Sequence, residues 1–240
     1  WEKPLAVGKF DDALALAADT PWAQAYIRGR AAQRRGAYAD AEAAYRTAVE
    51  AQPAGEPAVA LAELLTSLGR RTEADDLWQT IQRTGQVTRT GDVLGRAARA
   101  AQALGAVRLA NAYFQTAANL SPDDPRLHTR WGDLFLEKWN EAEARSSYET
   151  ALKADAQYVP ALVGLARSLA DSNPGAAEAA AKQAIAIDPT QPEAWLLLAS
   201  EAMDASKRDE ARAALQKVLE VNPRQVEALA LSAALAQIED

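Results

Sequence analysis

The chain has 240 residues, of which 49% are hydrophobic and 25% charged, as in folded globular proteins. It has no Cys and one His, His128, which excludes a disulfide framework or thiolate metal site and argues against an imidazole metal site. The net charge of −7 argues against nucleic acid as a partner. No stretch approaches the roughly 18 consecutive apolar residues of a membrane span, so we expect no membrane insertion.

Alanine supplies 58 residues, whereas aromatic residues make up only 6% of the chain. Alanine is the best helix former and fills little volume, so the composition predicts thin, closely packed helical layers. The Ala- and Arg-rich, Lys-poor usage is typical of a bacterial protein. For the compartment, cytoplasm and periplasm both remain open.

In chain order, residues 1–21 come first and predict a partial unit, in which Gly8 begins a turn before a short helix. Full units follow at about 22–55, 55–88, 91–124, 125–158, 159–191 and 192–225. Residues 226–240 then supply one more helix, as a partial or capping unit. Both ends look interrupted. We therefore expect a piece of a longer protein, with a final capping helix as the alternative.

The units follow from a repeat of about 34 residues. One small residue recurs in each unit, at Ala41, Ala74, Ala110, Ala144, Ala177 and Ala211. A large residue follows four positions later in five of the six units, as Tyr45, Trp78, Phe114, Tyr148 and Leu215. Residues four apart share one face of a helix, and Gly36, Gly69 and Gly105 suit tight turns before these helices. Each unit is therefore predicted to be a helical hairpin.

This pattern resembles the tetratricopeptide repeat family, and it covers nearly the whole chain. Residues 192–225 match closely, with Trp195, Leu198, Ala199, Ala202, Ala211, Leu215, Val218 and Pro223 at the family's positions. The resemblance implies an all-α fold, a right-handed α-α superhelix of about six to seven hairpins in a single array over 1–240. It implies about thirteen or fourteen helices.

Two departures from the pattern carry expectations. Trp139 stands where three other units have the turn glycine, Gly36, Gly69 and Gly105. The segment from Gly85 to Gly91 has two glycines, extra residues and no proline, so we expect loose packing between the units on either side of it.

No catalytic motif is present: the chain lacks HExxH, a P-loop, G-x-S-x-G and a dinucleotide-binding turn. We therefore expect a protein that is not an enzyme and that takes no metal and no other cofactor. His128 is interpreted as a packing or surface residue.

The resemblance implies that the first helix of each unit lines a concave groove that holds a protein or peptide partner. The peptide-binding candidates are Tyr26, Arg30, Arg96, Arg99, Thr129, Arg130, Val163 and Arg167. Arginine binds carboxylates through a planar fork, so the hypothesis is a segment that carries Asp, Glu or a free C-terminus. Alternatively, the arginines pair with acidic residues of neighbouring units, such as Glu63 and Asp133.

Two functions remain open at this point. The first is a non-catalytic protein–protein interaction scaffold. The second is the repeat region of a larger enzyme, or of an envelope secretion or export machine, whose catalytic or membrane part lies outside this chain.

Overall fold

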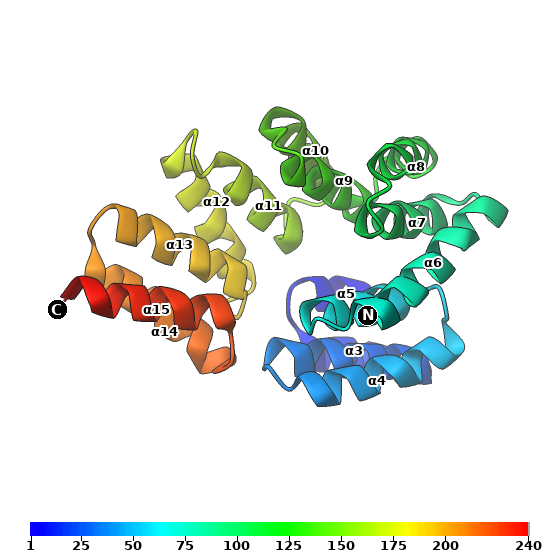
Figure 1. The fold of residues 1–240 in the computed structure, drawn as a ribbon, viewed down its shortest axis with the longest axis horizontal. Helices are drawn as coiled ribbons and strands as arrows, with labels where there is room; N and C mark the ends of the chain where they lie inside the picture. The colour runs from blue at the N-terminus through cyan, green and yellow to red at the C-terminus, as the bar shows by residue number, and fades with distance from the viewer. Residues whose placement is uncertain (240) are drawn as a thin grey trace.

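The computed structural model describes residues 1–239, which form fifteen helices and no strand (Figure 1). Their bounds are α1 Glu2–Ala6, α2 Phe10–Leu16, α3 Pro21–Arg34, α4 Tyr38–Ala51, α5 Glu56–Ser67, α6 Arg71–Val87, α7 Gly91–Ala103, α8 Val107–Leu120, α9 Pro125–Glu137, α10 Glu141–Ala154, α11 Val159–Leu169, α12 Pro174–Ile187, α13 Pro192–Asp204, α14 Arg208–Val221 and α15 Val226–Glu239.

The helices pack as consecutive hairpins, α3 with α4, α5 with α6 and so on to α13 with α14. The array of helical hairpins curves into an α-α superhelix, which confirms the predicted all-α solenoid class (Figure 1). The structure has more helices than expected, because residues 2–6 form the short helix α1 before the turn at Gly8. No helix among the described residues is long and apolar enough to cross a membrane.

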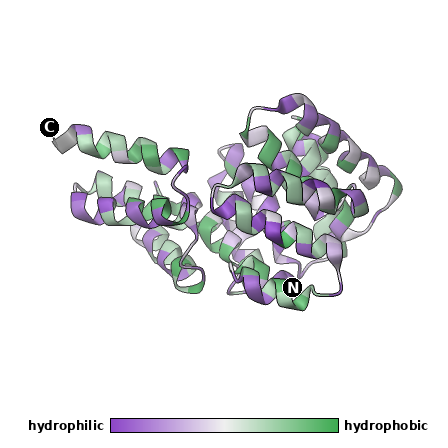
Figure 2. Ribbon diagram, turned by 90° about the horizontal axis from the view of Figure 1, so that it is seen from below, coloured by the Kyte–Doolittle hydropathy of each residue, from purple (hydrophilic) through white to green (hydrophobic). Residues whose placement is uncertain are grey.

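The core is thin, because small residues hold the helices close together. The small residues of the repeat are almost fully buried, between 0% and 1% exposed: Ala41, Ala74, Ala110, Ala144, Ala177 and Ala211. Large side chains fill the space between neighbouring first helices. Tyr148 is one of them: a Cβ at Gly132 would lie 2.6 Å from its ring, so this glycine makes room for the tyrosine. Figure 2 shows polar and apolar residues alternating around most helices.

Four hairpin turns use glycine in the left-handed region, at Gly8, Gly36, Gly69 and Gly105, with φ between 74° and 77°. Trp139 occupies the same kind of turn with φ 59°, and 89% of its surface is exposed. A left-handed backbone costs a residue with a Cβ free energy that glycine does not lose. The turn therefore keeps its conformation despite the wrong residue type.

The expectation of loose packing after Gly85 is wrong. With no proline to end it, α6 runs to Val87, and Gly85 lies buried inside the helix. A Cβ on Gly85 would lie only 2.5 Å from the Cβ of Ala97 in α7. The glycine thus permits a close approach of the two helices.

Candidate functional site

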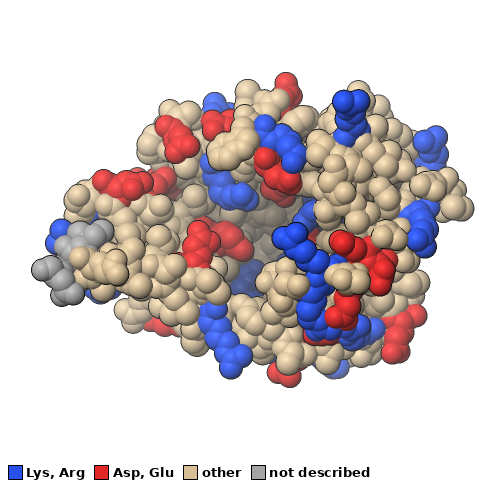
Figure 3. All heavy atoms as spheres, in the orientation of Figure 1, with Lys and Arg blue, Asp and Glu red and all other residues tan. Residues whose placement is uncertain are grey.

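The first helices of the hairpins carry most of the charged side chains that the sequence singled out. They are α3, α5, α7, α9 and α11, and ion pairs join α5 to α7 and α5 to α9. Figure 3 shows a hollow near the centre of the molecule, with basic and acidic side chains around it. The candidate site is this concave surface and its rim.

Three candidates lie within the helical layer. Tyr26 is 4% exposed, Thr129 5% and Val163 6%. The hydroxyl of Thr129 donates to the carbonyl of Pro125 in its own helix, at 2.8 Å. Val163 belongs to an apolar cluster with Leu162. These three side chains leave little surface for a partner.

Arg130 of α9 is paired with Glu56 of α5. Its guanidinium donates to both carboxylate oxygens, at 3.0 Å and 2.6 Å, and both side chains are mostly shielded from solvent. Burial by itself would raise the pKa of Glu56. The charge and hydrogen bonds of Arg130, with the charges of Arg126 and Arg96, outweigh burial and lower the pKa of Glu56 to about 2. The pair stays charged at neutral pH.

Arg96 and Arg99 of α7 are also held. Arg96 pairs with Asp92 one turn away and donates to the carbonyl of Ala54 at 2.9 Å. Arg99 donates to Glu63 of α5 at 3.0 Å and lies over the ring of Trp78, 5.3 Å from its centre. Arg96, Arg99 and Arg130 are therefore all held by ion pairs, Arg96 within its own helix and the other two between hairpins.

Arg30 and Arg167 differ from these three, because neither has an ion-pair partner among the described residues. Arg30 donates to the hydroxyl of Tyr26 at 3.1 Å and is otherwise exposed. Arg167 is exposed on α11. Burial raises the pKa of Tyr158, and the charges of Arg130, Arg126 and Arg30 oppose that rise. Arg30 therefore lies close enough to the start of α11 to act on it electrostatically.

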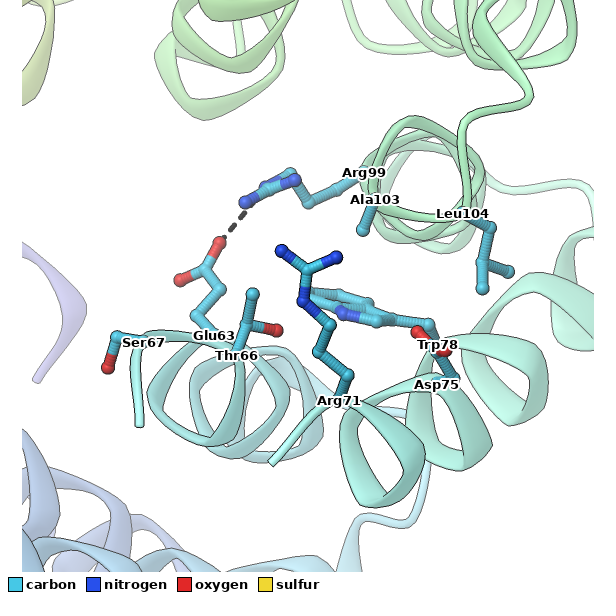
Figure 4. Close-up of a pocket in the computed structure, with 9 residues that line it drawn as sticks. All are labelled: Glu63, Thr66, Ser67, Arg71, Asp75, Trp78, Arg99, Ala103 and Leu104. Atoms are coloured by element: carbon cyan, nitrogen blue, oxygen red, sulfur yellow. Dashed lines mark hydrogen bonds and ion pairs between the residues drawn. The ribbon is translucent and has the colours of Figure 1, made fainter. Parts of the chain in front are cut away.

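A cavity of about 610 Å³ opens where the hairpin α5–α6 meets α7 (Figure 4). It lies beside the ion pair of Glu63 and Arg99, at the rim of the concave surface. Its lining consists of Glu63, Thr66, Ser67, Arg71, Asp75, Trp78, Arg99, Ala103 and Leu104. We call this the rim pocket. Its volume lies in the range of small-ligand and peptide side-chain sites.

Arg71 is a basic residue of the rim pocket that the sequence did not single out. Its guanidinium points into the space in front of Trp78 (Figure 4). It is exposed and has no hydrogen-bond or ion-pair partner among the described residues. Arg71 begins α6, the second helix of a hairpin, and the family pattern directs attention to first helices. Only the packing of α7 against this hairpin brings Arg71 beside Arg99.

Charged groups and hydrogen bonds dominate the site. His128 is 8% exposed, and its Nε2 lies 2.7 Å from the carbonyl oxygen of Pro122, so it fastens α9 to the preceding loop. Within residues 1–239, no three His, Cys, Asp or Glu side chains are grouped so that they could hold a metal ion.

The comparisons with known proteins agree with this architecture. Residues 168–235 match the family model described as tetratricopeptide repeat. No curated protein sequence matches the chain. Among solved structures, TTC0263, a thermophilic TPR protein of Thermus thermophilus, has a TM-score of 0.63 and 22% identity, covering 76% of this chain and 98% of that chain.

Two further structures share the fold. The APC/C hetero-tetramer Cut9–Hcn1 has a TM-score of 0.60 and 16% identity over 95% of this chain, which spans only 46% of the matched chain. YrrB, described as a TPR protein with an unusual peptide-binding site, has a TM-score of 0.51 and 16% identity over 79% of this chain and 97% of that chain. The repeat model matched over residues 168–235, the continuous run of helical hairpins and the TPR structures that share this architecture show that the chain has the tetratricopeptide repeat fold.

Proposed function

We propose that the protein is a non-catalytic scaffold that binds a peptide or protein segment along its concave surface, with the rim pocket as the anchor. The fold itself is that of protein–protein interaction scaffolds. The description of YrrB as a peptide-binding TPR protein supports the same kind of ligand here. The single observation that carries the proposal is the rim pocket, where the guanidinium of Arg71 has no partner within residues 1–239 and lies beside that of Arg99.

The rim pocket favours an acidic group. Arg71 offers all its N–H donors, and an Asp or Glu side chain or a C-terminal carboxylate can accept two of them at once. The guanidinium of Arg99 already donates to Glu63 and stacks on Trp78, so it adds positive charge from a fixed position. Ala103 and Leu104 supply an apolar wall for the neighbouring residue of the partner.

The concave surface beyond the rim pocket contributes less than the sequence suggests. Arg96, Arg99 and Arg130 are paired, so a ligand carboxylate would have to displace Asp92, Glu63 or Glu56. Arg30 and Arg167 are the candidates that retain free donors. We propose that they contact the segment further along the groove.

A peptide library tests this function. Random twelve-residue peptides are selected on the immobilised protein, and the selected peptide is titrated into the parent, Arg71→Ala and Arg108→Ala. Arg108 is an exposed arginine of α8 with no role in the pocket, so it controls for a general loss of positive charge. We expect selected peptides to contain Asp or Glu, and Arg71→Ala to weaken binding about tenfold or more.

Two outcomes would contradict the proposal. One is that the parent protein selects no peptide. The other is that Arg71→Ala binds the selected peptide as tightly as Arg108→Ala does. The alternative function, as the repeat region of a larger enzyme or export machine, remains a hypothesis, and a partner bound in the rim pocket is compatible with it.

A further inference from the structure

Two turns near the N-terminus lie against two loops near the C-terminus. We call this contact the clasp. One side is formed by the α1–α2 and α3–α4 turns and the other by the α12–α13 and α14–α15 loops. The N-terminal side contributes Gly8, Arg34, Gly36 and Tyr38, and the C-terminal side contributes Asp188, Thr190 and Asn222. The partners are separated by 154 to 184 residues in its hydrogen bonds. The superhelix therefore curls far enough for its first hairpins to touch its last ones.

The clasp consists of two groups of contacts, which we call its rungs. The first rung centres on Asp188. This carboxylate is 3% exposed and accepts from Arg34 at 3.0 Å. The same guanidinium donates to the carbonyl and hydroxyl oxygens of Thr190, at 2.9 Å and 3.1 Å. A Cβ at Gly8 would lie 2.6 Å from the carboxylate of Asp188, so the turn rests directly on it.

The second rung repeats this arrangement one hairpin further on. Asn222 is 6% exposed and donates from Nδ2 to the hydroxyl of Tyr38 at 3.3 Å. A Cβ at Gly36 would lie 2.8 Å from the Cγ of Asn222. Asp188 and Asn222 both stand just before a proline at the end of a second helix, so the rungs use equivalent positions. The N-terminal turns thus meet a repeated feature of the later hairpins.

The other glycine turns show that the contact is selective. Gly69 and Gly105 have φ 77° and the same place in their hairpins, but no atom of the described residues lies within 4 Å of a Cβ built on either. Apolar contact adds to the polar rungs, because Val7 packs against the cluster that contains Val159 and Leu162. The clasp therefore combines hydrogen bonds, an ion pair and apolar packing between two edges of the array.

We propose that the clasp closes the concave groove into a ring, so that its partner is an extended chain segment and opening of the clasp controls entry from the side. Ion pairs between first helices hold the opposite wall together, and the clasp completes the circuit of side-chain contacts around the hollow in Figure 3. A closed ring admits a chain only end-on, which favours an extended segment over a folded domain. The identity of the partner rests on the proposed function, whereas the closed ring does not.

The first experiment tests the ring without any ligand. The chain has no Cys, so dyes for energy transfer can be attached at Arg35→Cys and Arg224→Cys, two exposed positions beside the clasp. We expect high transfer in this labelled protein and a clear fall on Gly36→Ala. Gly69→Ala carries the same backbone strain away from the clasp and should leave transfer unchanged. Arg34→Ala should lower transfer as well, with the helical circular dichroism retained.

Low transfer in the unmodified background, or an equal response to Gly36→Ala and Gly69→Ala, would overturn the closed ring. The second experiment tests entry, with the library-selected peptide free or flanked at both ends by a folded domain. We expect the flanked peptide to associate about tenfold more slowly with the parent, and Arg34→Ala to remove that difference. Equal association rates with the parent would overturn control of entry by the clasp, while leaving the anchoring role of Arg71 to its own test.

Discussion

Arg130 and Glu56, which are 74 residues apart in sequence, form an ion pair with two hydrogen bonds between α9 and α5. This pair braces the concave surface. The guanidinium is therefore part of the scaffold, because α5 and α9 belong to hairpins that are not neighbours along the array. Removal of the Arg130 guanidinium should therefore lower the stability of the fold more than it weakens the binding of a partner.

We predict that Arg130→Ala lowers the free energy of unfolding by about 3 kcal/mol, because it leaves a shielded carboxylate without its partner. Urea unfolding followed by circular dichroism measures this. Arg46→Ala is the control: Arg46 is 48% exposed in its pairs, and the expected loss is below about 1 kcal/mol. Equal losses in the two variants would show that the Arg130–Glu56 pair does not brace the fold.

The same pair predicts that the free energy of unfolding depends on pH in the acidic range. A carboxyl group whose pKa is lowered on folding stabilises the protein above its ordinary pKa, and this contribution is lost as the pH falls through the folded-state pKa of about 2. Glu56→Gln should cost about 3 kcal/mol at neutral pH and progressively less between pH 4 and pH 2. Unfolding curves across this range test the convergence. Glu178→Gln, at a largely exposed pair, should show almost no such change.

In contrast to the destabilising changes above, a substitution at Trp139 is predicted to stabilise the protein. Replacement by glycine should raise the free energy of unfolding by roughly 0.5–1 kcal/mol, because glycine adopts φ 59° without strain and the exposed indole has little packing to lose. Thermal melting of Trp139→Gly and Trp139→Ala separates the causes. The alanine variant keeps the strained turn, so a gain in both variants would show that the backbone is not the reason.

Gly85→Ala should be destabilising, although alanine is normally the better residue inside a helix. The new Cβ would meet Ala97 at 2.5 Å, and overpacking of this kind costs about 1–3 kcal/mol. Gly175→Ala is the matched control, since Gly175 lies in α12 with open space around it and should tolerate or gain from the change. A stabilised Gly85→Ala protein would indicate that α6 and α7 are further apart than the structure places them.

The sequence predicts the helical hairpins well, because each rests on contacts repeated within about 34 residues. The burial of Ala144 and of Tyr148 follows directly from their spacing on one helix face. The sequence misleads at Gly85, because a glycine has two uses: it can loosen a turn or let two helices touch. Sequence alone does not separate these uses without the position of Ala97.

The candidate site is less predictable, because it depends on how distant hairpins meet. Arg99 is paired with Glu63, and Arg130 with Glu56, only because the curvature of the array brings these side chains together. The availability of Arg71 depends likewise on the packing of α7 against α6. The clasp has no sequence signal of its own, since Asp188 occupies a position that recurs at each hairpin end.

Photocrosslinking from the rim pocket tests the central claim most directly. Benzoylphenylalanine is placed at position 67 in the pocket lining, or at position 79 on an exposed part of α6 outside it, and the library-selected acidic peptide is added under ultraviolet light. We predict a crosslinked product from position 67, with excess unlabelled peptide suppressing it, and none above background from position 79. A product from position 79 alone, or equal products from both positions, would contradict binding in the rim pocket.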